Sequence, residues 1–187
     1  MTDSPAFTAI AFSGSLRRDS SNTGLVNMAA RLAPAELHLD VVNDVVNALP
    51  FYNADLEEAV PPEVQRWRDL VAAADALIIG MPEYNFGPSA VAKNAIDWVS
   101  RPFGGQALVS KVIALLTSGG KGGGNRVQEA IGPILGLLGN TVVVDPPVQI
   151  VLGMNRIQAD GTTTDPDVEA AVMGKLAAVV QALNQRG

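Results

Sequence analysis

The chain has 187 residues, 48% of them apolar and 17% charged, which suits one globular domain spanning residues 1–187. Its formal net charge of −6 argues against non-specific nucleic-acid binding, which needs a basic surface. There is no cysteine and only one histidine, His38, so disulfides, thiolate catalysis and Cys- or His-rich metal sites are excluded.

The N-terminal residues MTDSPAFTAIAF lack the basic patch of a signal peptide. No stretch reaches the roughly 18 uncharged apolar residues of a membrane span. Together with the lack of cysteine, these features predict a cytoplasmic protein without a membrane partner.

Short apolar runs alternate with segments of helical period, which is typical of βαβ units and a parallel sheet. The strands are expected at 7–12, 37–41, 76–80, 112–116 and 142–144. In the second of these, Leu37, Leu39 and Val41 alternate with His38 and Asp40, which predicts a half-exposed edge strand. His38 is therefore expected to be solvated or packed rather than catalytic.

Helices are expected after each of the strands. Their predicted positions are after the cap residues 20–22, from Pro62, over 88–99, over about 127–138, and from Pro166 with Asp165 as N-cap. Pro133 lies inside the fourth of these helices and is expected to kink or split it.

Five strands joined by right-handed crossover helices predict an α/β three-layer sandwich, a doubly wound parallel sheet of order 2-1-3-4-5. Ligands of such sheets bind outside the carboxyl ends of the strands. Three unusual segments directly follow the first, third and fourth strands: SGSLRRDSSN, MPEYNFGP and TSGGKGGG. The fold therefore predicts that all three lie together at one ligand crevice.

The first segment offers what a phosphate group needs. Ser15, Ser20 and Asn22 supply hydroxyl and amide groups, Arg17 supplies positive charge, and a helix N-terminus follows. Without GxxxxGK[ST] or GxGxxG, a terminal monophosphate fits better than a dinucleotide pyrophosphate. The alternative is that Ser20 or Asn22 only caps the helix and the arginines are solvated.

The second and third segments suit a flat ligand. The turn Pro82-Glu83-Tyr84-Asn85 would present backbone amides and an aromatic ring to a planar heteroaromatic group. The glycines from Gly119 to Gly124 would allow close backbone approach. Taken alone, an ordinary strand-to-helix turn and a flexible surface loop with a solvated Lys121 are the alternatives.

Taken together, these segments resemble the NAD(P)H-dependent FMN reductases, a family with azoreductase-, quinone- and chromate-reducing members. GSLRRDSSN resembles the family's GSLRxxSxN, and MPEYNFGPSAVAKNAIDWVSR resembles its PEYN…P…LKNAIDW segment. TSGG and LPFYNADLE have counterparts as well, so the likeness runs from about residue 7 to the fifth strand. Pro88 stands one position earlier than the family's proline, and Ala92 replaces a usual leucine.

The resemblance implies a flavodoxin-like fold, FMN as cofactor and NADPH or NADH as co-substrate. Ser15, Arg17, Ser20 and Asn22 would hold the FMN phosphate; Pro82, Glu83, Tyr84 and Asn85 would line the isoalloxazine; Ser118, Gly119 and Gly120 would contact its pyrimidine edge. It also implies a homodimer or homotetramer.

Because flavin N5 carries the chemistry, no catalytic side chain and no metal are expected. The implied reaction is ping-pong hydride transfer from NAD(P)H to a small acceptor: a quinone, azo compound, flavin or metal oxyanion. Structural roles are expected for Lys93, Asn94, Asp97 and Trp98, which pair at i, i+4 on a helix. The alternatives are a flavodoxin-type electron carrier and a flavin-free interaction module on the same fold.

Overall fold

The computed structural model describes residues 5–102 and 105–186. Its central sheet has five parallel strands in the order β2-β1-β3-β6-β7, which confirms the predicted order. The strands are β1 (Phe7–Ser13), β2 (Leu37–Val41), β3 (Ala76–Gly80), β6 (Val112–Gly119) and β7 (Thr141–Val151). β2 and β7 are the two edges of this sheet.

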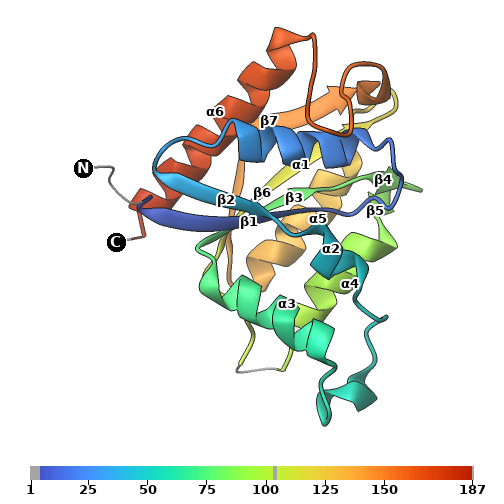
Figure 1. Cartoon of the computed structure of the whole chain (residues 1–187), viewed down its shortest axis with the longest axis vertical. Helices are drawn as coiled ribbons and strands as arrows, with labels where there is room; N and C mark the ends of the chain where they lie inside the picture. Colours follow the sequence, from blue (N-terminus) through green and yellow to red (C-terminus); the bar gives the residue numbers. More distant parts are fainter. Residues whose placement is uncertain (1–4, 103–104, 187) are drawn as a thin grey trace.

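Two hydrophobic cores lie on opposite faces of the sheet because successive strand residues point to opposite sides. One face packs against α1 (Ser21–Arg31) and α6 (Pro166–Asn184). The other packs against α2 (Asn43–Asn47), α3 (Pro62–Ala73), α4 (Ala90–Val99) and α5 (Asn125–Leu137). Figure 1 shows these two helical layers above and below the sheet, with the start of β1 and the end of α6 on the opposite side of the molecule from β4 and β5. In the described ranges no helix is long and apolar enough to cross a membrane.

Several helix ends follow the sequence signals. Ser20 is the N-cap of α1 and its Oγ accepts from Thr23 N at 3.3 Å, while the Oδ1 of Asp165 caps α6 by accepting from Asp167 N at 3.1 Å. Pro62 occupies the first turn of α3, where its missing N–H costs no hydrogen bond. His38 is exposed on β2, as expected, with Asp40 as its neighbour at 3.1 Å.

Several predicted element bounds differ from the structure. The fourth and fifth strands extend well beyond residues 116 and 144, to Gly119 and Val151. α4 begins at Ala90 behind the N-cap Ser89, because Pro88 belongs to a two-stranded hairpin instead. α5 is assigned as one helix through Pro133, so the proline does not split it. The short elements α2, η1 (Ala54–Glu57) and η2 (Gly153–Asn155) were not foreseen.

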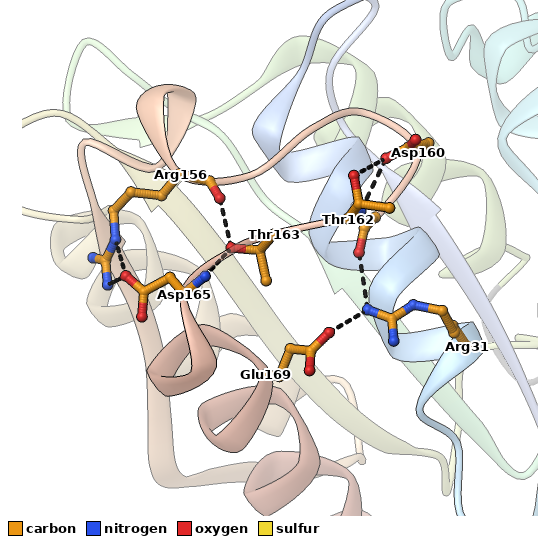
Figure 2. Close-up of polar contacts among 8 residues, drawn as sticks. Arg31, Arg156, Asp160, Thr162, Thr163, Asp165 and Glu169 are labelled. Carbon is orange, nitrogen blue, oxygen red and sulfur yellow. Dashed lines mark hydrogen bonds and ion pairs between the residues drawn. The ribbon is translucent and has the colours of Figure 1, made fainter.

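A long connection between β7 and α6 is fastened onto α1 and onto the start of α6 by side chains (Figure 2). Arg156 forms an ion pair with the N-cap Asp165, and the pKa of Asp165 is lowered mainly by this hydrogen bond. Thr163 Oγ1 donates to Arg156 O at 2.6 Å. Arg31 of α1 donates to Gly161 O at 3.1 Å and to Glu169 of α6 at 2.6 Å. These contacts fix the segment that leaves the carboxyl end of β7.

Lys175 is buried beneath an irregular part of β7. The register between β6 and β7 shifts after Val143, so residues 144–147 bulge from the ladder. Lys175 Nζ reaches from α6 and donates to Val143 O at 2.9 Å and Val144 O at 2.8 Å. Desolvation lowers the pKa of Lys175 to about 8, and the nearby carboxylate of Asp145 offsets only part of this effect.

Burial of the Lys175 ammonium makes the free energy of unfolding depend on pH. Below the folded-state pKa of about 8, Lys175 is charged in both states and its desolvation cost is fully present. Between about 8 and the ordinary value of 10.5, only the unfolded chain keeps the proton, so stability rises with pH. Urea unfolding should therefore show wild type gaining stability relative to Lys175→Met across this window. A difference between the two proteins that stays constant with pH would contradict the assignment.

Candidate cofactor site

The structure brings the three predicted loops together at the carboxyl edge of β1, β3 and β6. Their residues line a cleft of about 140 Å³. The lining consists of Ser15, Arg17, Ser20, Ser21, Asn22, Pro82, Glu83, Tyr84, Ser118, Gly119, Gly120 and Met154. Every predicted site residue except Asn85 is in this set.

The first loop folds around serine hydroxyls at the start of α1. Ser13 Oγ accepts from Ser15 N at 3.2 Å, and Ser15 Oγ accepts from Arg17 N at 3.4 Å. The first N–H groups of α1 have no acceptor within the helix, and together with the helix dipole they favour an anion at this end. Arg17 is exposed at the rim and donates to Asp19 O at 3.0 Å. Ser20 therefore caps the helix and lines the cleft as well.

The first and third loops are joined by buried hydrogen bonds. Asn22 Nδ2 donates to Ser118 O at 2.9 Å, and Ser118 N donates back to Asn22 Oδ1 at 3.0 Å. The hydroxyls of Ser21 and Ser118 lie 2.7 Å apart. Because the Asn22 amide is engaged with Ser118, its side chain positions the loops, and its contribution to an anion would come from its backbone N–H.

The second loop is a hairpin of β4 (Glu83–Tyr84) and β5 (Gly87–Pro88). Asn85 and Phe86 form its turn with φ of 51° and 67°, the left-handed backbone that tight hairpin turns use. Asn85 is thus at the exposed tip rather than in the cleft. Pro82 and β4, rather than the whole predicted turn, therefore lie along the cleft.

The hairpin is also joined to the start of α5, directly after the third loop. Glu83 Oε2 accepts from Val127 N at 3.2 Å, in the first turn of α5. The guanidinium of Arg126 lies 4.4 Å from the centre of the Phe86 ring. The Glu83 side chain thus caps a helix, which leaves its backbone to face a ligand.

Gly14 allows the first loop to approach the second. A Cβ at this position would lie 2.4 Å from Ser89 Oγ, 2.8 Å from Ala92 Cβ and 3.1 Å from Pro82 Cδ. The small Ala92, fully buried under the N-terminus of α4, is part of this close packing. The two departures from the family pattern, Pro88 and Ala92, therefore lie in the hairpin and beneath this contact.

A second, wider groove adjoins the cleft. It has a volume of about 350 Å³ and is lined by Gly14, Leu16, Arg17, Tyr84, Ser89, Ala90 and Val91. Arg17 and Tyr84 line both spaces, so a ligand in the groove would lie next to one in the cleft.

Residues singled out on α4 have structural contacts. Asn94 Nδ2 and Trp98 Nε1 both donate to Pro50 O, at 2.9 and 2.8 Å, and Asn94 Oδ1 accepts from Tyr52 N at 2.7 Å. Lys93 and Asp97 form an ion pair along the helix surface. Asn94 and Trp98 thus hold the segment after α2 against α4, while Lys93 and Asp97 pair with each other, as their i, i+4 spacing predicted.

Two cleft residues, Ser21 and Met154, are not among those that the family resemblance implied. Ser21 belongs to the polar SSN run, and its hydroxyl lies 2.7 Å from that of Ser118. Met154 follows β7, whose carboxyl end meets the same edge of the sheet. Topology would have indicated it if the fifth strand had been predicted to its full length.

Comparisons with known proteins agree with this geometry. The family model for NADPH-dependent FMN reductase matches residues 7–153. An NAD(P)H-dependent FMN reductase of Pseudomonas aeruginosa is 34% identical over 172 residues, covering 91% of each chain. A 2-hydroxy-1,4-benzoquinone reductase of a Burkholderia species is 35% identical over 155 residues, covering 82% of this chain and 84% of its own.

A solved structure extends the likeness to three dimensions. FerB, a flavoenzyme NAD(P)H:(acceptor) oxidoreductase from Paracoccus denitrificans, superposes with a TM-score of 0.84 at 30% identity, covering 96% of this chain and 98% of FerB. The matched family segment contains all three loops and ends at Gly153, one residue before Met154. The chain belongs to the NADPH-dependent FMN reductase family.

Proposed function

We propose that this protein binds FMN in the cleft between the three loops and uses NAD(P)H to reduce a small acceptor. The observation that carries the proposal is the cleft itself, in which hydroxyl groups and a guanidinium that suit a phosphate lie beside the hairpin and the third loop. Membership of the FMN reductase family supports the same cofactor and activity.

The donor set at the start of α1 fits a phosphate dianion. The hydroxyls of Ser15 and Ser20, the guanidinium of Arg17 and the first amides of α1, including that of Asn22, would hold it. The chain as a whole is acidic and would repel a phosphate dianion. The positive charge of Arg17 close to the phosphate is therefore important for binding.

The flat part of FMN would lie between the hairpin and the third loop. Pro82, Tyr84 and the backbone of Glu83 would form one wall, with Asn85 supporting the turn at its tip. Ser118, Gly119 and Gly120 would contact the pyrimidine edge, where backbone N–H groups favour negative charge. When bound, FMN supplies two-electron hydride transfer at its N5 atom. The chain binds, orients and shields it.

The adjoining groove is where we place NAD(P)H and then the acceptor. It shares Arg17 and Tyr84 with the cleft and has room for a flat ring next to the cofactor. One shared groove would require the oxidised nicotinamide to leave before the acceptor enters, which is a ping-pong scheme. Quinones are favoured as acceptors by the names of the relatives, ahead of azo compounds, free flavin and metal oxyanions.

Anaerobic stopped-flow spectroscopy tests this function. Mixing the FMN-loaded protein with NADPH or NADH alone should bleach the flavin absorbance, and a quinone added afterwards should restore it. Flavin that stays oxidised until both substrates are present would rule out the ping-pong order. A protein that binds FMN but is never reduced by NAD(P)H would be an electron carrier instead, and one that binds no FMN would be an interaction module.

Arg17→Ala should weaken FMN binding by roughly 1.5–3 kcal/mol, the scale of a hydrogen bond to a charged group. That is about a 10- to 150-fold rise in Kd. Arg18→Ala is the matched control, because Arg18 is also exposed but does not line the cleft. Fluorescence titration measures both. Equal Kd values for Arg17→Ala and wild type would remove Arg17 from the phosphate site.

We also propose that the protein forms a homodimer or homotetramer. Its cytoplasmic location stays a prediction. Leu16 and Phe51 expose 66% and 79% of their surface and line one groove together with Val91, and a contiguous exposed apolar surface of this kind favours association. Leu16 also lines the groove beside the cleft, so a second copy there would border the site. Sedimentation equilibrium should give a multiple of 19.5 kDa; a monomer of 19.5 kDa would contradict the proposal.

A further inference from the structure

The end of β7 builds a fourth side of the cleft that belongs to none of the three predicted loops. Leu152 N donates to Gly119 O at 2.8 Å, which fastens this segment to the third loop. η2 then turns tightly, with Asn155 N donating to Leu152 O at 3.0 Å and Ile157 N to Gly153 O at 2.8 Å. The backbone on both sides of Met154 is therefore fixed.

Gly153 sits directly on a residue of the cleft. A Cβ at this position would lie 2.2 Å from Ser118 Oγ, the hydroxyl that also contacts Ser21. Only a residue without a side chain permits this approach, so η2 rests on the junction between the first and third loops. On its far side, the ion pair of Arg156 with Asp165 anchors the segment to α6 (Figure 2).

Met154 belongs to this fixed segment, lines the cleft and is 55% exposed. An exposed methionine alone carries no meaning. Met173 on α6, for example, is 53% exposed and lines none of the described cavities that border the cleft. Met154 differs because it lines the same cleft as Tyr84, Gly119 and Gly120. A thioether is polarisable and adaptable, and it packs favourably against aromatic rings.

We propose that Met154 is a fourth contact for the cofactor, whose side chain packs against FMN and closes the cleft on the side of the third loop. This proposal rests on the proposed function, because it requires FMN to occupy the cleft. Met154 would act by contact and exclusion of water, so its effect should appear in cofactor affinity and in accessibility.

Oxidative footprinting tests the contact without using activity. Hydrogen peroxide transfers one oxygen atom to a thioether sulfur and leaves as water, and the rate follows exposure of the sulfur. FMN-free and FMN-saturated protein are treated in parallel, and peptide mass spectrometry follows Met154 and Met173. FMN should slow oxidation of Met154 by about fivefold or more, because reactivity follows exposure. Met173, of nearly equal exposure, should be unaffected.

A pair of variants gives a second readout. Met154→Ala should raise the Kd for FMN by about three- to tenfold, whereas Met154→Leu, which keeps the apolar volume, should stay near wild type. Met173→Ala is the control for a general effect of removing an exposed methionine. Unchanged Met154 oxidation in protein shown by fluorescence quenching to hold FMN would overturn this proposal and leave the proposed function standing. A failure of FMN to bind at all would overturn both.

Discussion

The reciprocal pair between the Asn22 side-chain amide and the Ser118 backbone is the contact on which the site depends. It crosses from the start of α1 to the end of β6 and is buried, so a lost partner would leave an unsatisfied polar group. Two further junctions complete the frame: the Glu83 carboxylate at Val127 N and the close packing over Gly14. Loops that are far apart in the sequence are thereby fixed to one another before any ligand arrives, which lowers the ordering cost of binding.

The site residues therefore fall into two groups, those that join the loops and those that face the cleft. The side chains of Asn22 and Glu83 form hydrogen bonds that join the loops, so these residues would contact a ligand mainly through their backbone. Ser15, Arg17 and Tyr84 keep side-chain groups at the cleft and its rim. The result suits a cofactor that carries its own chemistry, since such a cofactor needs position and electrostatics from the protein rather than an acid–base pair.

The sequence predicted the sheet order and most of the site because both follow from strong patterns. β2 alternates between apolar and polar residues, and β3 is a continuous apolar run. Because the strands are parallel, the loops that follow them lie at the same edge of the sheet. The failures have equally local causes. Thr117, Ser118 and Gly119 have loop-like composition, yet pairing with β7 keeps them in β6. Pro146 and Pro147 hid the length of β7, since their place in it is a bulge held by Lys175. Because the predicted fifth strand ended at Val144, Met154 was not expected at the cleft.

In the proposed function, the start of α1 and Arg17 hold a phosphate while the hairpin and the third loop hold a flat ring. Comparing FMN with riboflavin, which has the same ring but no phosphate, tests this most directly. Fluorescence titrations of the flavin-free protein should show FMN binding about 100-fold more tightly or better, because several charge-assisted hydrogen bonds are lost with the phosphate. Equal affinities for the two flavins would contradict the account.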